Sequence, residues 1–188
     1  MDMKVTDTSL PGVKLIEPVV HDDERGFFME SYQTQRYQDA GIAHEFVQDN
    51  VSRSAKGTLR GLHYQLHRPQ GKLVMVVTGE VYDVAVDIRK GSPTFGQWYG
   101  ATLSADNHHQ MYVPPGYAHG YCVTSDYADF LYKCTDYYHP DDEYSVLWSD
   151  PELAIDWPVS SPILSAKDSQ ASCLSKVNED HLPVYTAS

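Results

Sequence analysis

Cysteine is scarce in this sequence, and so are basic residues and long apolar runs. The 188 residues include only three cysteines, Cys122, Cys134 and Cys173, with no Cys-x-x-Cys pair. An odd count without that spacing argues against a disulfide framework and against a cysteine-based zinc site. We therefore expect buried free thiols.

Basic residues are outnumbered by acidic ones. Lysine and arginine total 14 and aspartate and glutamate total 26, which gives a formal net charge of −12. Non-specific binding to nucleic acid or to an anionic membrane depends on excess positive charge, so this balance argues against both partners. A local group of arginine and lysine side chains can still bind a small anionic substrate.

No apolar run is long enough to cross a bilayer. The longest runs, Lys72–Thr78 and Val81–Ile88, are far shorter than the roughly 20 residues that a transmembrane helix needs. Residues 1–15 lack the apolar segment of a secretion signal. We expect a cytoplasmic protein.

Two nucleotide-binding motifs are also missing. Neither G-x-G-x-x-G after a strand nor G-x-x-x-x-G-K-[ST] occurs, so nothing supports a Rossmann oxidoreductase or a P-loop enzyme. No repeat, low-complexity tract or polar linker divides the chain. We therefore expect one domain over residues 1–188.

Alternation of apolar and polar residues predicts many short strands and little helix. The clearest strand covers Glu80–Ile88, where every second side chain from Tyr82 is apolar and the opposite face includes Asp83 and Asp87. Other strands are predicted over 45–54, 58–65, 72–77, 97–103, 110–113, 119–123, 128–135 and 144–148. This pattern indicates an all-β sandwich or jelly-roll barrel.

One short helix is predicted over Thr34–Ala40, ending at Gly41. Glycine readily adopts the left-handed conformation with which helices commonly end. A few turns near the C-terminus are further candidates for short helices.

Two stretches resemble the paired motifs of the cupin superfamily, whose double-stranded β-helix barrel usually holds a metal on three histidines and one glutamate. The first contains His63, Gln65 and Lys72, and the second is Pro114–His119. Gln65 stands at the position of the second histidine and Lys72 at that of the glutamate. A protonated lysine has no lone pair and glutamine is a poor transition-metal ligand, so we expect no metal and no other cofactor.

Three further histidines, His67, His108 and His109, could substitute as ligands. They lie in polar, turn-like segments. Exposed histidine is the expected outcome in such segments.

Eight segments in order across the chain carry a more specific resemblance. They are Asp23–Phe28 with Glu30, Phe46–Asn50, Leu59–Gln65, Asp83–Asp87, Ser92–Trp98, Pro115–Gly120, Asp129–Lys133 and Leu164–Asp168. On these segments the sequence strongly resembles the dTDP-4-dehydrorhamnose 3,5-epimerases, a family of the cupin superfamily. Eight ordered motifs are far more specific than one short motif.

The resemblance implies an all-β, cupin-type jelly roll, that is a double-stranded β-helix barrel, with a few short peripheral helices. It also implies an isomerase that inverts C3 and C5 of dTDP-4-dehydro-6-deoxy-D-glucose to give dTDP-4-dehydro-L-rhamnose. Both carbons flank the C4 ketone, so a base can remove their hydrogens and leave an enolate. This chemistry needs a base on one face of the sugar, an acid on the other, and a positive charge or hydrogen-bond donor at the ketone oxygen.

The resemblance implies four catalytic residues. His63 is the expected base, because an imidazole with an ordinary pKa of about 6.5 is largely neutral near pH 7. Asp168 is expected to orient that imidazole, Tyr132 to act as the acid and Lys72 to stabilise the enolate oxygen.

Each of these residue types also has an ordinary structural role. A histidine or tyrosine in a β core is often a packed side chain with a satisfied polar atom, and a lysine at a strand end often points into water. Strand alternation places Tyr132 on one face with Phe130 and Cys134, and that face is expected to look into the barrel.

Other family positions predict contacts to the substrate. Arg25, Arg60 and Lys167 offer positive charge to a diphosphate, His119 is expected near the sugar or phosphates, and Tyr138 is expected to stack on thymine. The remaining matched positions are Phe28, Glu30, Gln48, Asp49, Asn50 and Glu143.

The resemblance also implies a homodimer with composite sites. In the family, the segment that holds Arg25, Phe28 and Glu30 reaches the site of the partner subunit. Residues 1–50 are therefore expected to contribute to the dimer interface.

Three departures from the family pattern leave alternatives open. His21 replaces a common aromatic, Val51 follows the Gln-Asp-Asn motif where histidine is usual, and Tyr121 replaces a common phenylalanine. The alternatives are a single-site C3 or C5 epimerase of a related dTDP-keto-deoxysugar, a non-catalytic sugar-nucleotide-binding cupin, and a metal-dependent cupin oxygenase.

Overall fold

The computed structural model describes residues 3–186, so residues 1, 2, 187 and 188 of the expected domain lie outside the described part. The strands are β1 Lys4–Asp7, β2 Lys14–Glu17, β3 Val20–Asp23, β4 Gly26–Met29, β5 Gln48–Ala55, β6 Leu59–Gln65, β7 Lys72–Thr78, β8 Glu80–Asp87, β9 Trp98–Ser104, β10 Gln110–Val113, β11 Tyr117–Val123, β12 Tyr127–Cys134 and β13 Glu143–Ser145. The helices are α1 Thr34–Asp39 and α2 Ala166–Ser169, with 3₁₀ turns η1 Pro140–Asp142, η2 Leu174–Lys176 and η3 Glu179–His181.

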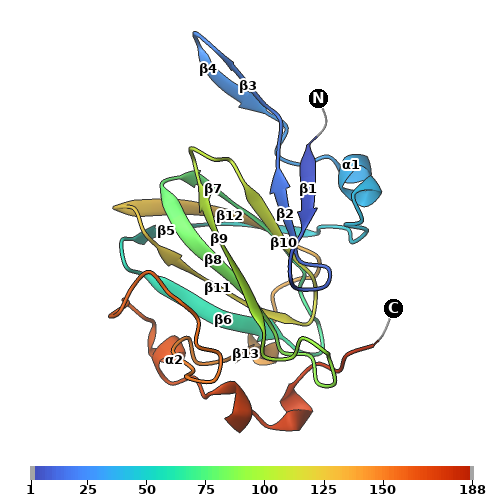
Figure 1. The fold of residues 1–188 in the computed structure, drawn as a ribbon, viewed down its shortest axis with the longest axis vertical. Coiled ribbons are helices and arrows are strands. Elements are labelled where there is room, and N and C mark those ends of the chain that lie inside the picture. The colour runs from blue at the N-terminus through green and yellow to red at the C-terminus, as the bar shows by residue number, and fades with distance from the viewer. Residues whose placement is uncertain (1–2, 187–188) are drawn as a thin grey trace.

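Two antiparallel sheets form the body of the molecule (Figure 1). The first has the order β1-β2-β10-β7-β12-β5 and the second the order β13-β6-β11-β8-β9. Strands that neighbour each other in a sheet are mostly distant in sequence, as in a jelly roll. The fold is therefore all-β and of the cupin type, as the sequence predicts.

The main apolar core lies between the two sheets. It combines Val74 and Phe130 from the first sheet with Val81, Ala85 and Leu103 from the second, each at most 1% exposed. Burial of such side chains contributes about 25 cal/mol per Å² of apolar surface, which makes this layer the principal stabilising feature of the barrel.

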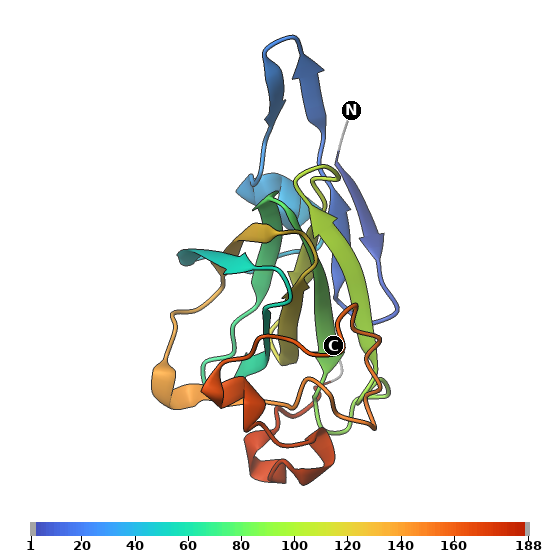
Figure 2. The same cartoon turned by 90° about the vertical axis from the view of Figure 1, so that its left-hand side faces the viewer.

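A second apolar layer covers the outer face of the five-stranded sheet. This layer contains Val84 and Val86 of β8 and Ile88, the residue after that strand. They pack against Leu153 and Leu174 of the C-terminal segment. That segment, drawn in orange to red, runs along the lower part of the molecule in both views (Figure 1, Figure 2). Both faces of β8 are consequently buried, whereas its sequence suggested one apolar and one partly acidic face.

Helix α1 packs against the other sheet. Tyr37 and Ile42 form a third apolar cluster with Ile16, Leu73 and Tyr112. The helix ends as predicted, because Gly41 adopts a left-handed φ of 84°.

The β3–β4 hairpin projects away from both sheets in the two views (Figure 1, Figure 2). It forms its own two-stranded sheet. Phe27 and Phe28 near its tip are 57% and 72% exposed. Neighbouring exposed phenylalanines are more typical of surfaces that contact a partner than of a solvated surface.

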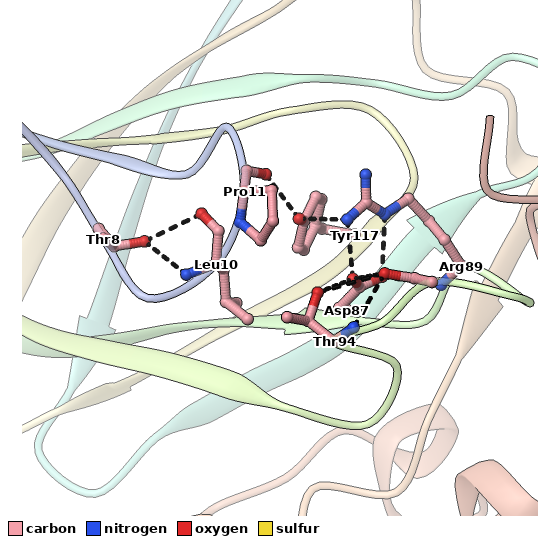
Figure 3. Close-up of polar contacts among 8 residues, drawn as sticks. Thr8, Leu10, Pro11, Asp87, Arg89, Thr94 and Tyr117 are labelled. Atoms are coloured by element: carbon pink, nitrogen blue, oxygen red, sulfur yellow. Dashed lines mark hydrogen bonds and ion pairs between the residues drawn. The ribbon is translucent and has the colours of Figure 1, made fainter. Parts of the chain in front are cut away.

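A buried carboxylate fixes the turn after β8 and the first loop of the chain (Figure 3). Asp87 accepts hydrogen bonds from Arg89 at 2.7 and 2.9 Å and from Thr94 at 2.6 Å. Arg89 also donates to the Tyr117 hydroxyl, which donates to the backbone oxygen of Pro11 at 2.7 Å. Burial alone would raise the pKa of Asp87. The hydrogen bonds from Arg89 and Thr94 lower the pKa by more than burial raises it, so it lies below the ordinary value.

Among residues 3–186, no helix is both long and apolar enough to cross a membrane.

Replacement of this carboxylate should destabilise the fold. Asp87→Ala leaves the half-buried Arg89 guanidinium without its acceptor, and loss of one partner of a buried pair costs about 3–5 kcal/mol. The measurement is urea unfolding followed by tryptophan fluorescence. The control is Glu179→Ala, which removes the exposed partner of Lys90 and should leave the midpoint close to that of the wild type. Equal midpoints for Asp87→Ala and the wild type would contradict this account.

Candidate active site

A cavity of about 330 Å³ opens between the two sheets. Its walls include side chains from β5, β6, β7, β11, β12 and β13 and from the loop that follows β12. The lining residues are Gln48, Asn50, Ser52, Arg60, His63, Gln70, Lys72, His119, Tyr121, Phe130, Tyr132, Tyr138 and Glu143. Nine of the fifteen predicted site residues belong to this set.

The period of two along a strand decides which neighbours reach the cavity. On β5, Gln48, Asn50 and Ser52 line the cavity, whereas Asp49 bonds Lys133 at 2.9 Å on the opposite face. The structure therefore does not bring Asp49 into the site with its neighbours. The same alternation could have identified Ser52, Tyr121 and Phe130, each two residues from a predicted site residue.

Strands β6 and β11 approach closely beside the site because two glycines face each other. A Cβ atom on Gly61 would lie 2.5 Å from the Cα atom of Gly120, and one on Gly120 would lie 2.7 Å from the backbone oxygen of Arg60. Gly61 also has a φ of 130°, a backbone conformation that residues with a side chain rarely adopt. The ladder is irregular here, and His63 pairs directly with His119.

His63 is bound by a carboxylate from the C-terminal segment. Its Nε2 atom lies 2.5 Å from Oδ1 of Asp168, which is only 2% exposed. Asp168 belongs to helix α2, whose first turn is capped by the Ser165 hydroxyl. Burial raises the pKa of Asp168, but the hydrogen bond and charge of His63 lower it more, so the net pKa is below the ordinary value.

The carboxylate of Glu143 lies close to three other side chains. Its Oε2 atom lies 2.5 Å from the Lys167 ammonium and 2.8 Å from the Tyr138 hydroxyl, which donates to it. Its Oε1 atom lies 3.8 Å from Nδ1 of His63. Burial raises the pKa of Glu143, but the bonds from Lys167 and Tyr138 and the charge of His63 lower it below its ordinary value.

Lys72 has no counter-ion bonded to it. Within residues 3–186, its ammonium makes no hydrogen bond or ion pair in the structure, although it lines the cavity. Burial lowers the pKa of Lys72, and the neighbouring Cys134, Glu143 and Asp83 side chains offset only part of that effect. The Lys72 ammonium can therefore bind an anionic or carbonyl oxygen in the cavity.

Tyr132 lies on the wall formed by the six-stranded sheet. Its ring packs 5.8 Å from Phe130, and Phe130 stacks on Tyr121 at 4.0 Å. Burial raises the pKa of Tyr132 to about 12, so the phenol keeps its proton near neutral pH. Among the described residues no hydrogen-bond partner occupies that phenol, whereas the Tyr121 hydroxyl is bonded to Ser52 at 2.9 Å.

Other predicted ligand positions already make contacts within the chain. His119 bonds the buried Asp83 through Nε2 at 2.9 and 3.0 Å, and Arg60 donates to Ser54 at 3.1 Å. Gln48 accepts from the backbone of Tyr138 at 3.0 Å. Asp83 is a site-supporting residue that sequence reasoning placed only on a strand face.

The hairpin positions lie outside this cavity. Arg25 bonds Asp23 within the hairpin, and Glu30 bonds Arg36 at 3.0 Å. Phe28 and Glu30 border a separate hollow beside α1. This chain therefore does not bring Arg25, Phe28 and Glu30 to its own His63.

The donor set is poor for a metal. Gln65 stands where cupins place a second histidine. Its side-chain amide donates to the backbone oxygen of Arg68 at 2.7 Å and accepts from the backbone N–H of His139 at 2.8 Å. Within residues 3–186, no three His, Cys, Asp or Glu side chains lie close enough together to hold a metal ion.

A cavity of titratable side chains enclosed by two antiparallel sheets defines a cupin-type protein with a site built for proton transfer. The family model described as dTDP-4-dehydrorhamnose 3,5-epimerase matches residues 7–176. The chain belongs to the dTDP-4-dehydrorhamnose 3,5-epimerase family.

Individual relatives agree with this membership. The chain is 57% identical over 170 residues to a dTDP-4-dehydrorhamnose 3,5-epimerase of Pseudomonas aeruginosa, covering 89% of this chain and 94% of the relative. A solved epimerase from Legionella pneumophila, in complex with dTDP-4-keto-L-rhamnose, is 56% identical, with a TM-score of 0.96 and coverage of 98% and 100%. The 3'-monoepimerase ChmJ of Streptomyces bikiniensis, in complex with dTDP-quinovose, is 36% identical, with a TM-score of 0.89 and coverage of 95% and 92%.

Removal of the Lys72 charge should stabilise the fold. Lys72→Met eliminates the cost of partly burying an unpaired ammonium, which we expect to raise the free energy of unfolding by about 1 kcal/mol at pH 7. Because the pKa of Lys72 is lowered on folding, the cost is present below that lowered pKa and disappears above the ordinary lysine pKa. The gain should therefore shrink between pH 7 and pH 11 in chemical denaturation.

The control for this variant is Lys4→Met, whose ammonium is exposed and paired with Glu17. That substitution should alter unfolding little at either pH. A Lys72→Met protein less stable than the wild type at pH 7 would show that the ammonium is satisfied in the folded state.

Proposed function

We propose that this chain inverts C3 and C5 of dTDP-4-dehydro-6-deoxy-D-glucose and so forms dTDP-4-dehydro-L-rhamnose. One observation carries the proposal. His63, bonded to Asp168, and Tyr132 line the same cavity from opposite sheets, and Lys72 at the start of β7 lines it as well. A base and an acid on facing walls are what inversion at carbon requires, because the proton must leave one face and return to the other.

The proposed step balances without a redox partner. His63 takes the proton from C3 or C5 through the nitrogen that Asp168 does not bind. The C–H electron pair becomes the C=C bond of an enolate, and the C4 carbonyl pair moves to oxygen. Tyr132 then protonates the carbon from the opposite face and the carbonyl re-forms. Exchange with solvent returns the proton to Tyr132 and removes one from His63.

Two charges support that step. The Lys72 ammonium is proposed to bind the enolate oxygen, where its effect is large because the cavity excludes much of the solvent. Asp168 is proposed to stabilise the imidazolium that forms on His63. The lowered pKa of Asp168 keeps it ionised for this purpose.

The nucleotide is proposed to bind at the open side of the cavity. Arg60 and Lys167 offer positive charge to the diphosphate, and Tyr138, which is 49% exposed, offers a ring for thymine. His119, Gln48, Asn50 and Glu143 line the same cavity. Asp49 remains a weaker candidate, because its side chain is turned to the other face of β5.

We further propose a homodimer with composite sites. The projecting hairpin and its exposed Phe27 and Phe28 fit a role in a partner subunit, to which it would bring Arg25, Phe28 and Glu30. Residues 1–50 would then contribute to the interface of a single-domain protomer. The cytoplasmic location expected from the sequence stays a prediction.

A single-site epimerase is the second candidate. The monoepimerase ChmJ shares the fold at a TM-score of 0.89, so the architecture is compatible with inversion at one carbon. Both activities use the same acid, base and ketone chemistry, and the count of exchanged carbons separates them.

Deuterium incorporation tests the reaction directly. The wild type, incubated with the dTDP-keto sugar in heavy water, should place deuterium at two carbons as counted by mass spectrometry. His63→Ala should reduce exchange by a factor of 10² or more, within the usual contribution of a general base of roughly 10²–10⁴. Tyr132→Phe should still exchange but yield little inverted product, because protons return to the face that they left.

The outcomes divide the candidates. One exchanged carbon in the wild type favours the single-site epimerase, and none favours a binding protein. Exchange by His63→Ala at the wild-type rate would refute the assignment of the base, provided that dTDP binding by this variant is unchanged.

Mixed dimers test the composite site. His63→Ala and Arg25→Ala proteins should each be weakly active alone, and their exchange into mixed dimers should restore about one quarter of the wild-type activity. Restoration occurs because the site with an intact His63 receives the intact Arg25 of its partner. If Arg25 acts within its own chain, mixing restores nothing.

A further inference from the structure

Glu143 is held in place by two side chains from different parts of the chain. The Lys167 ammonium comes from α2, and the Tyr138 hydroxyl comes from the loop after β12. Both bind the same oxygen, Oε2, at 2.5 and 2.8 Å. The other oxygen, Oε1, is left directed at the imidazole of His63.

His63 therefore lies between two carboxylates. Nε2 is bonded to Asp168 at 2.5 Å, and Nδ1 lies 3.8 Å from Oε1 of Glu143. A separation of 3.8 Å is too long for a hydrogen bond but well within the range at which one charge stabilises another. The nitrogen left free by Asp168 is the one that would take the proton, and it faces Glu143.

The strand register explains this placement. Glu143 begins β13, which pairs with β6 so that Glu143 lies opposite Gln65 and Ser145 lies opposite His63. Diagonal neighbours in an antiparallel pair lie within reach of long side chains. Glu143 at this end of β13 therefore lies near Nδ1, while Asp168 of α2 is bonded to Nε2.

Other charged or titratable groups line the same cavity or pair with Glu143. They are His119 on β11, Lys72 on β7, Tyr132 on β12, Arg60 on β6, Tyr138 in the loop after β12 and Lys167 on α2. Asp168 and Glu143 are the two carboxylates in direct contact with, or next to, its ring nitrogens.

We propose that Glu143 is a positioning residue for proton transfer, which supplies a second negative charge beside His63 and is itself fixed by Lys167 and Tyr138. This inference rests on the proposed function, in which His63 is the base. It differs from a role in holding the nucleotide, because its main effect falls on the protonation of His63. The ionised state that it requires agrees with the lowered pKa of Glu143.

The test is the titration of His63 by NMR in the protein without substrate. The signal is assigned among the nine histidines by its absence in His63→Ala. Glu143→Gln retains the size of the side chain but removes its charge, so the midpoint of His63 should be lower in this variant than in the wild type. In the reaction, the acidic limb of kcat/KM should move in the same direction, and kcat should fall roughly tenfold with KM little changed.

Lys167→Gln is the matched control of opposite sign. It removes the positive charge beside Glu143, so the midpoint of His63 should rise. Two variants of the same ion pair that move the midpoint in opposite directions identify a charge effect, because loss of packing would not reverse its sign.

An unchanged midpoint in Glu143→Gln, or shifts of the same sign in both variants, would overturn the inference. The titration does not require turnover. A wild type that fails to exchange deuterium therefore refutes the proposed function while the NMR result stands by itself, and normal exchange with unshifted midpoints refutes only the role of Glu143.

Discussion

The bond between His63 and Asp168 is the contact on which the rest of the site depends. It joins a strand inside the barrel to a four-residue helix in the C-terminal segment, 105 residues later. That helix is too short to be stable alone. Its position is set by the apolar layer in which Leu153, Leu174 and Leu182 cover the outer face of the five-stranded sheet. Packing on one side of that sheet thus helps to fix the orientation of the proposed base, His63, on the other.

The cavity exists because the space between the sheets is filled unevenly. Apolar side chains such as Val74 and Leu103 close one part of it, whereas polar side chains line the remainder. A buried ammonium without a bonded counter-ion is unfavourable for folding. Lys72 is tolerated because the surrounding ladder is continuous and the main core is extensive, and its unsatisfied state leaves it free to bind a developing anion.

Sequence patterns predicted the interior of the fold better than its edges. The nine predicted strands all correspond to observed ones, with shifts of a few residues at their ends, and the helix after Gln33 lies where expected. The first four strands escaped prediction. β1 and β3 are four residues long and mostly exposed, so they lack the alternation that marks a half-buried strand, and distant pairing or a hairpin turn creates them.

Prediction of the site had a similar limit. Motifs placed His63, Lys72 and Tyr132, and the structure brings them to one cavity. Alternation along β5 puts Asp49 and Asn50 on opposite faces, but the motifs could not show which of the two faces meets the other sheet. Nor could any local pattern relate Glu143, Lys167 and His63, whose proximity results from the docking of β13 and α2 on β6.

The same geometry explains why the motifs separate double from single inversion poorly. His63 and Tyr132 lie on facing sheets, which pack about 10 Å apart, and both line the cavity between those sheets. In the proposed mechanism, inversion at a second carbon requires the ring to present C5 where C3 had been, while its ketone stays near Lys72. That requirement falls on the shape of the cavity and on contacts that hold the nucleotide, and not on the residues that move protons. Relatives with one or two inversions can therefore share the barrel and the same proton-transfer chemistry.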